Sequence, residues 1–367
     1  MQIAFAIVSL FPGGGLQRDC LRLARRAQTR GHVVTVFAAR VLGETAPDIA
    51  VEILPNRAWT NHGRNLYFAT ALRTAVSGRF DRIVGFDKLM GLDVLYCADP
   101  SIAARGGYFL RRITPRYRTL RALEAASFAR GRTTRILMLS RTQLEAYRTA
   151  WNTEPVRMTL LPPAIDPARQ HPQYRFDGTR DRMRRLLGIS DGHRLWLAIG
   201  VQPRTKGFDR IVHALRSDPE ALVALVGLGS DDKSARYLQD AARRLSCADR
   251  LLFLGFREDV PMLMAAADVL VHPARYETTG TVLLEALVNG LPVITTGACG
   301  YAEHVAAAGG GVVIPEPFSA DQLLAALRRA RDPGQRAQWG ANAIDYGKNH
   351  DLYGGVDRAL GAILCEV

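Results

Sequence analysis

Short runs of apolar, often β-branched residues alternate along the chain with longer segments in which apolar residues recur every three or four positions. The first pattern predicts buried strands, and the second predicts amphipathic helices. In the first half, strands are expected at residues 3–8, 33–38, 51–54, 82–86, 94–97 and 136–139. A glycine turn follows the first strand and leads into an expected amphipathic helix at 16–30.

The second half starts the same alternation again. Strands are expected at 195–200, 222–226, 251–254, 269–272, 293–295 and 311–314, with helices at 177–189, from Phe208, and at 234–245, 260–266 and 281–289. Such alternation gives parallel sheets with helices on both faces. We therefore predict an α/β protein of two doubly wound, Rossmann-like domains, with ligands at the carboxyl ends of their strands.

Two consecutive prolines, Pro162 and Pro163, mark the boundary between the two series. Proline fixes φ and lacks a backbone donor, so neither a helix nor a central strand continues there. The prediction is a first domain at 1–161 and a second at 164–346. The last amphipathic stretch, 352–364, has no strand after it.

The composition of the 367 residues adds two expectations. The five cysteines are scattered without a CxxC pair, which favours a reducing, cytoplasmic location over a disulfide framework or a zinc site. No uncharged apolar stretch reaches the roughly 18 residues of a membrane span, and the apolar N-terminus is interpreted as a strand.

The net charge of +13 is concentrated in residues 105–135, where aromatic residues are interleaved with nine arginines: Arg105, Arg111, Arg112, Arg116, Arg118, Arg121, Arg130, Arg132 and Arg135. The one acid in this segment is Glu124. A solvated helix face, an anionic membrane surface and nucleic acid all fit this composition. Arginines on lipid phosphates, with rings at headgroup depth, favour the membrane.

Two carboxylates, Glu277 and Glu285, lie eight positions apart across a predicted loop that runs into a helix. The backbone N–H groups of a helix N-terminus bind anionic oxygens, and carboxylates accept hydrogen bonds from hydroxyl groups. The pair therefore predicts a site for a phosphorylated, polyhydroxyl ligand. His272 ends the preceding strand, and either a structural role or a role as a base fits it.

Two further loops follow predicted first strands. Gly14 and Gly15 open a helix without forming GxGxxG, and they allow close approach of a ligand to the backbone. Arg204 and Lys206 stand in the matching loop of the second domain, where they would neutralise a leaving diphosphate. Asp-x-Asp, which would hold a metal on a nucleotide diphosphate, is absent, so we expect no metal and no cofactor.

Polar groups also gather in the first domain. Asn61, His62 and Arg64 lie in one pentapeptide between apolar segments, more polar than a helix start alone requires. Asp99 follows a predicted strand, where either a cleft carboxylate or a plain Asp-Pro turn would fit.

These motifs resemble the retaining GT-B glycosyltransferases, whose mark is a Glu-x7-Glu pair after an Arg/Lys-Gly loop. Specific strings resemble the lipopolysaccharide core glucosyltransferase I group, over nearly the whole chain: residues 14–19, 60–65, 84–86 with 91–94, and 299–302. The resemblance implies the GT-B fold, two domains facing across a cleft. It also implies that 347–367 return to the first, acceptor-binding domain, with 164–346 binding a UDP-sugar.

The resemblance also implies roles at the donor site. Glu285 would bind the ribose of UDP, and Glu277 would contact sugar hydroxyls. Arg204 and Lys206 would steady the β-phosphate. The remaining donor residues would be Gly14, Gly15, Arg257, Thr279, Gly280, Thr281 and Val282.

On the acceptor side, the resemblance implies Asp19 and Asp99, with a lipid-A-linked inner-core heptose as acceptor. The basic segment (Arg105, Arg111, Arg112, Arg116, Arg118), with Asn61, His62 and Arg64, would then meet the inner membrane. Retention without an obvious nucleophile favours front-face attack, with the diphosphate as base.

Two departures from the group leave alternatives open. The basic pair is Arg204-Thr205-Lys206 and not adjacent Arg-Lys, and Thr278-Thr279 replaces smaller residues. A UDP-N-acetylhexosamine donor therefore remains an alternative to UDP-glucose. A GT-B sugar-nucleotide epimerase would not need the basic segment, and a nucleic-acid binder would leave the glycine loop and the glutamate pair unexplained.

Overall fold

The computed structural model describes residues 1–12, 14–43, 46–54, 58–105 and 112–366. The chain forms two compact units: unit 1 is Met1–Ala164 with Gly354–Val367, and unit 2 is Ile165–Tyr353. The sequence places the return to the first domain at residue 347. In the structure the chain stays in unit 2 until Tyr353, because helix α13 continues to Asn349.

Unit 1 contains a parallel sheet of seven strands in the order β3-β2-β1-β4-β5-β6-β7. The strands are β1 (Gln2–Leu10), β2 (Val33–Val41), β3 (Ala50–Ile53), β4 (Arg82–Gly85), β5 (Val94–Cys97), β6 (Arg135–Met138) and β7 (Met158–Leu160). Its helices are α1 (Gly15–Thr29), α2 (Asn61–Val76), α4 (Pro115–Phe128), α5 (Arg141–Trp151) and α14 (Gly355–Leu364). Sequence analysis missed β7, a three-residue edge strand.

Unit 2 repeats this plan with a parallel sheet of six strands in the order β10-β9-β8-β11-β12-β13. The strands are β8 (Arg194–Ile199), β9 (Ala221–Val226), β10 (Leu251–Gly255), β11 (Val269–His272), β12 (Val293–Thr296) and β13 (Gly311–Ile314). The helices are α6 (Thr179–Leu186), α7 (Phe208–Ala214), α8 (Arg236–Arg244), α9 (Val260–Ala266), α10 (Thr281–Val288), α11 (Ala302–Ala308), α12 (Ala320–Arg329) and α13 (Pro333–Asn349).

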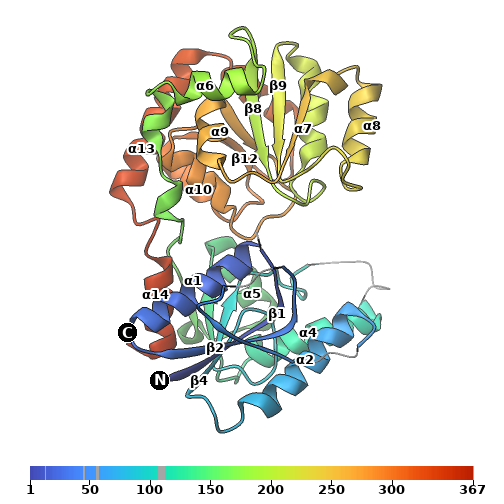
Figure 1. The fold of residues 1–367 in the computed structure, drawn as a ribbon. Coiled ribbons are helices and arrows are strands. Elements are labelled where there is room, and N and C mark those ends of the chain that lie inside the picture. Colours follow the sequence, from blue (N-terminus) through green and yellow to red (C-terminus); the bar gives the residue numbers. More distant parts are fainter. Residues whose placement is uncertain (13, 44–45, 55–57, 106–111, 367) are drawn as a thin grey trace. The chain divides into compact units, whose positions relative to one another are not determined.

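Each sheet is covered on both faces. In unit 2 one core cluster joins α9, α10 and α13 to the sheet, and a second joins α7, α8 and α12 to the opposite face. Figure 1 shows α9 on one side of β8 and β9, with α7 and α8 on the other. The strand order of each sheet reverses once, between β1 and β4 and between β8 and β11. Ligands of such sheets bind outside the carboxyl ends of the strands at that reversal.

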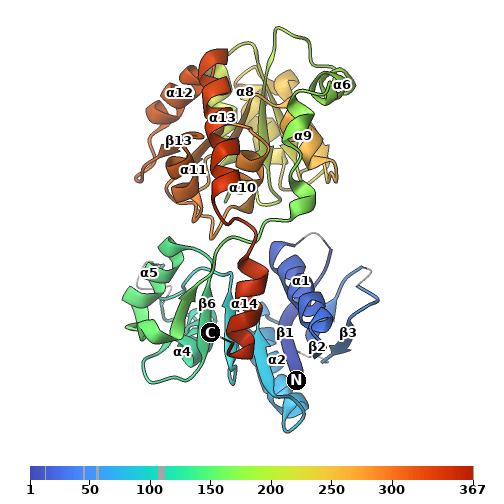
Figure 2. The same ribbon diagram turned by 90° about the vertical axis from the view of Figure 1, so that its left-hand side faces the viewer.

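The C-terminal helix α14 completes unit 1 (Figure 2). It packs beside α1, and its Leu360 and Ile363 are fully buried in the same cluster as Leu23 of α1. An ion pair between Arg26 and Asp357 adds little, because both side chains are about half exposed. Apolar burial therefore holds the returning segment in place.

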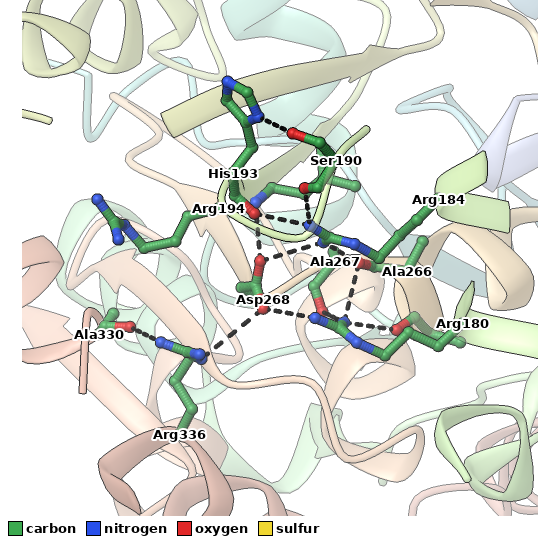
Figure 3. A network of polar contacts seen from close by, with 12 residues as sticks. Arg180, Arg184, Ser190, His193, Arg194, Ala266, Ala267, Asp268, Ala330 and Arg336 are labelled. Carbon is green, nitrogen blue, oxygen red and sulfur yellow. Dashed lines mark hydrogen bonds and ion pairs between the residues drawn. The ribbon is translucent and has the colours of Figure 1, made fainter. Parts of the chain in front are cut away.

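A buried polar network fixes the first residues of β8 and β11 in unit 2 (Figure 3). The Asp268 carboxylate accepts hydrogen bonds from the Leu195 N–H at 2.8 Å, from Arg180 at 2.7 Å and from Arg184 at 3.4 Å. The two arginines also donate to main-chain carbonyls at the end of α9, including that of Ala266. The network holds together the two strands whose far ends carry the candidate site.

Candidate active site

The loops that follow β8 and β11 touch each other. Gly207, at the start of α7, has φ +72°, and a Cβ atom there would lie 2.0 Å from the carbonyl oxygen of Pro273. Only glycine fits both the backbone conformation and the contact. Its presence allows the Arg204–Gly207 loop to lie directly against the loop that carries Glu277.

Lys206 and Glu277 meet across this contact. The Lys206 ammonium donates a short hydrogen bond to Oε2 of Glu277, and both side chains are largely buried. The Nε2 atom of His272 lies 3.4 Å from the same oxygen, and its ring is buried at the end of β11. Burial by itself would raise the pKa of Glu277, but His272 and Lys206 outweigh it and lower that pKa to about 2. At neutral pH the carboxylate is therefore ionised and accepts hydrogen bonds only.

Helix α10 begins four residues after Glu277. Its N-cap, Gly280, has φ +86°, and no side chain caps the first turn. The N–H groups of Thr281 and Val282 thus lie where a helix binds anionic oxygens. Glu285 lies on the same helix and is 8% exposed. The predicted order of loop, helix start and second carboxylate is confirmed.

The segment Cys299–Tyr301 holds the Glu277 loop in shape. The Gly300 N–H donates to the Glu277 carbonyl at 3.0 Å, and the Tyr301 N–H donates to the Thr279 carbonyl at 2.7 Å. Glu277 also forms a parallel bridge with Cys299. This string, distinctive in the sequence, thus positions the backbone of the carboxylate loop.

The three predicted basic residues of the donor site each contact a different side chain. The Arg204 guanidinium lies 4.1 Å from the ring centre of Tyr237, on α8, while Lys206 contacts Glu277. In this conformation the Arg204 and Lys206 side chains therefore do not converge on one position, as joint binding of a diphosphate would require. Arg257 forms a bidentate ion pair with Asp259, at 2.7 and 2.5 Å, after β10.

In unit 1 the glycine loop leads into α1. Gly14 is the N-cap, and a Cβ atom there would lie 1.9 Å from the side-chain oxygen of Gln17. Gly15 is the first residue of the helix, and Gly13 lies outside the described residues. Asp19 accepts a hydrogen bond from the Tyr96 hydroxyl at 3.1 Å, and burial raises its pKa.

Asn61 and Arg64 lie in the first turn of α2 and line a cavity of about 570 Å³. His62 lies within 3.5 Å of Thr60, the N-cap, and does not line this cavity. Thr60 accepts a hydrogen bond from the Gly63 N–H at 3.1 Å. The pentapeptide is thus both a helix start and part of a cavity wall.

Asp99 lines a second cavity of about 220 Å³ beyond β5, together with Asp87 and Lys88. Burial, with a contribution from the charge of Asp99, raises the pKa of Asp87 to about 7. Lys88 pairs at 2.7 Å with the fully buried Glu124. Sequence analysis overlooked Asp87 and Lys88, although both directly follow a predicted strand.

The basic segment is exposed where the structure describes it. Arg105, Arg112, Arg116 and Arg118 are exposed, and Arg111 lies outside the described residues. Phe128 is one of the aromatic residues interleaved with these arginines, but it does not face a membrane surface: it is fully buried and stacks on Tyr147 with ring centres 3.9 Å apart. Glu124 is also internal: it accepts hydrogen bonds from Ser101 and Trp151 at 2.7 Å each.

Two further observations apply to the described part of the chain. No helix there is long and apolar enough to cross a membrane. No group of three or more His, Cys, Asp or Glu side chains in the same residues is placed to hold a metal ion.

Comparison with known proteins adds to this geometry. Residues 179–346 match the model of the glycosyl transferases group 1 family, and residues 13–169 match that of glycosyltransferase family 4. The chain is 39% identical to the lipopolysaccharide glucosyltransferase WaaG of Escherichia coli K12, over 99% of this chain and 98% of that protein. The chain belongs to the WaaG family of glycosyltransferases.

Solved structures agree with this family. A crystal structure of WaaG, described as a glycosyltransferase involved in lipopolysaccharide biosynthesis, matches 98% of this chain and 99% of its own, with TM-score 0.91 and 38% identity. The Anabaena protein HepE, solved with UDP-glucose, is 19% identical and shares the fold, with TM-score 0.79 over the full length of both chains. Like its WaaG relatives, the chain is a glycosyltransferase of the GT-B fold, as the sequence predicts.

Proposed function

We propose that the protein transfers glucose from UDP-glucose to a heptose of the lipopolysaccharide inner core, with retention of configuration. The observation that carries this proposal is the full-length 39% identity to a lipopolysaccharide glucosyltransferase. The contact between Lys206 and Glu277 at the strand-order reversal of unit 2 supports it. The UDP-glucose complex of HepE, a protein of the same fold, supports a UDP-sugar donor.

We assign the donor to the carboxyl ends of β8 and β11. The N-terminus of α10 would bind the diphosphate through the N–H groups of Thr281 and Val282. Glu285 would accept hydrogen bonds from the ribose. Glu277, ionised at neutral pH, would accept hydrogen bonds from the sugar hydroxyls. Arg257 and the Gly14–Gly15 loop complete the assignment.

The chemistry requires that the leaving diphosphate be stabilised. The bond between sugar C1 and the β-phosphate oxygen breaks, a bond from C1 to the acceptor hydroxyl oxygen forms, and the hydroxyl proton passes to the leaving phosphate. Lys206 would donate to that phosphate as its negative charge grows. Arg204 would assist only after leaving the ring of Tyr237. No metal ion takes part in this scheme.

On the acceptor side we assign Asp19 and Asp99 of unit 1, with Asn61, His62 and Arg64 at the start of α2. The exposed arginines 105, 112, 116 and 118, together with Arg111, would bind the anionic surface of the inner membrane from the cytoplasmic side. The acceptor is linked to lipid A, so attachment would bring the enzyme to its substrate.

The alternative of a UDP-N-acetylhexosamine donor rests on Thr278 and Thr279. The full-length relative is named a glucosyltransferase, which favours glucose. The same relative disfavours both a sugar-nucleotide epimerase and a nucleic-acid binder.

The donor assignment is tested by measuring transfer and hydrolysis across a panel of UDP-sugars, with EDTA present. We expect UDP-glucose to be preferred, and UDP to bind in calorimetry without added metal. Preference for UDP-GlcNAc or UDP-GalNAc would overturn the glucose assignment. UDP binding that requires magnesium would overturn the metal-free scheme.

Membrane attachment is tested separately with vesicles containing anionic lipid. Exchanging Arg112, Arg116 and Arg118 for glutamine should weaken vesicle binding by several fold per charge removed, since each basic residue contributes about 1 kcal/mol. Exchanging Arg243, Arg244 and Arg328, on two helices of unit 2, is the matched control. Unchanged vesicle binding in the first variant would remove this segment from the proposal.

A further inference from the structure

The cavity at the ends of β1 and β2 in unit 1 carries only positive charge among its described lining residues. It measures about 570 Å³ and is lined by Val8, Ser9, Ala39, Arg40, Ala58, Trp59, Asn61, Arg64 and Asn65. Two of these side chains are cationic and none is acidic. The hollow lies at the carboxyl ends of parallel strands, the edge where sheets of this kind bind ligands.

The two guanidinium groups are held at the cavity wall. The Nε atom of Arg40, on β2, donates to the Ser9 hydroxyl at 2.7 Å, which fixes the group beside the end of β1. Arg64 donates to the Ala58 carbonyl at 3.3 Å and reaches the Asn61 side chain at 3.4 Å. A pre-positioned guanidinium loses little rotamer freedom when it binds a carboxylate or a phosphate.

The N-terminus of α2 adds to this positive potential. The helix runs for 16 residues from Asn61 and has no acidic residue in its first turn. The N-terminus of a helix carries a partial positive charge that favours an anion nearby. Arg40, Arg64 and the helix start thus act on the same hollow with the same sign.

The remaining lining suits a sugar. Trp59 is 97% exposed, and so offers a flat apolar surface with almost nothing packed on it. An indole in this state gains free energy when a sugar ring covers it. The amides of Asn61 and Asn65 supply both donors and acceptors for hydroxyl groups.

We propose that this cavity binds an anionic group, a phosphate or a carboxylate, on the sugar acceptor, with Arg40 and Arg64 on the anion and Trp59 on the adjoining sugar face. The inference rests on the proposed function, because it names the chemistry of the acceptor that the enzyme selects. Arg40, which sequence analysis did not single out, becomes a specificity residue. If Arg40 had only a structural role, its function would be to hold the Ser9 side chain through their hydrogen bond, and it would not bind the acceptor.

The test uses the full-length enzyme and a deacylated, water-soluble inner-core oligosaccharide, so that no membrane is involved. Arg40→Gln and Trp59→Ala are compared with Arg73→Gln, an exposed residue in the last turn of the same helix and outside the cavity lining. KM for the acceptor, KM for UDP-glucose and UDP affinity are measured for each protein. Both test positions are exposed, so folding is preserved.

Arg40→Gln should raise KM for the acceptor by about ten- to a hundred-fold, the range of a lost charge-assisted hydrogen bond, with donor KM and UDP affinity unchanged. Arg73→Gln should match the wild type. The acceptor is then treated in two ways: aqueous HF removes its phosphates, and reduction removes its carboxyl groups. One of the two treatments should abolish the difference in acceptor KM between Arg40→Gln and the wild type. That treatment identifies the anion.

Three results would overturn the inference. Arg40→Gln could match the wild type on the deacylated acceptor. Its defect could appear only with membrane-embedded acceptor, which would assign the cavity to the lipid surface. The defect could also survive both chemical treatments. Failure of the wild type to transfer glucose at all would instead refute the proposed function, and UDP binding distinguishes that case.

Discussion

Replacing Asp268 by alanine should sharply destabilise unit 2 (Figure 3). The carboxylate is 7% exposed and pairs with Arg180 at 2.7 Å and Arg184 at 3.4 Å, while Arg336 lies 3.8 Å away. It also accepts a hydrogen bond from the Leu195 N–H, at the start of β8, at 2.8 Å. The substitution therefore leaves buried cations without their counter-charge.

The magnitude follows from the burial of the network. Removing one partner of a buried ion pair costs about 3–5 kcal/mol, because the remaining charge is uncompensated. The arginines keep their bonds to carbonyls such as that of Ala266, so the lower half of this range is expected. Domains are stable by only about 5–15 kcal/mol, so the loss is a large fraction. For a unit of this size, about 3–4 kcal/mol lowers Tm by about 6–16 °C.

Calorimetric and urea unfolding of the full chain would measure the effect. Asp240→Ala is the control, because Asp240 forms an ion pair with Arg243 in which both side chains are more than half exposed. Such a pair contributes about 0–1 kcal/mol. The reasoning is refuted if Asp268→Ala unfolds within about 1 kcal/mol of the wild type, or if the control loses as much.

Three further predictions concern the site. Lys206→Ala should lower kcat by about a hundredfold or more, because Lys206 would stabilise the leaving phosphate. The melting temperature should fall as well, because Glu277 loses a largely buried counter-charge, but the protein should still fold. Near-normal turnover in the folded variant removes Lys206 from the catalytic residues. Glu285→Ala should weaken UDP binding in calorimetry by about 1.5–3 kcal/mol, and a loss of kcat without a loss of affinity would contradict the ribose assignment. Burial and the charge of Asp99 raise the pKa of Asp87 from 3.8 to about 7, so the folded state holds this proton more tightly and stability falls as pH rises between these values. Asp87→Asn should flatten that part of the pH profile of urea unfolding, and an unchanged slope would contradict the shift.

The sequence predicts most of the fold because its strands are apolar runs bounded by turns. The pattern predicts both series of strands to within a few residues, and it correctly predicts Glu277 on a loop and Glu285 on the helix after it. Edge strand β7 was missed because three residues give no readable period. The boundary at 346 was wrong because the polar surface of α13 hides where that helix ends.

The site contacts were harder to predict because they join distant residues. Nothing in the local pattern pairs Arg204 with Tyr237, which lies on α8, one strand and one α-helix further along the chain. In the sequence, Arg40 is a single basic residue near the end of a predicted strand, and only the fold shows that it lies beside Ser9. Glu124 looked like a lone acid on a basic surface, yet it lies inside and binds Lys88. A single acid within an arginine-rich run is the signal that could have revealed it.

Because α14 returns to unit 1, the two units differ in when each can complete its folding during synthesis. Unit 2 is one uninterrupted stretch, Ile165–Tyr353, inserted into unit 1, so helix α14 of unit 1 is synthesised after all of unit 2. Unit 1 therefore cannot close its apolar face on Leu360 and Ile363 until α14 has been translated. A nascent chain that has emerged only as far as Tyr353 would carry a complete unit 2 and an open unit 1, so a stop codon before α14 would damage the unit that contains the N-terminus.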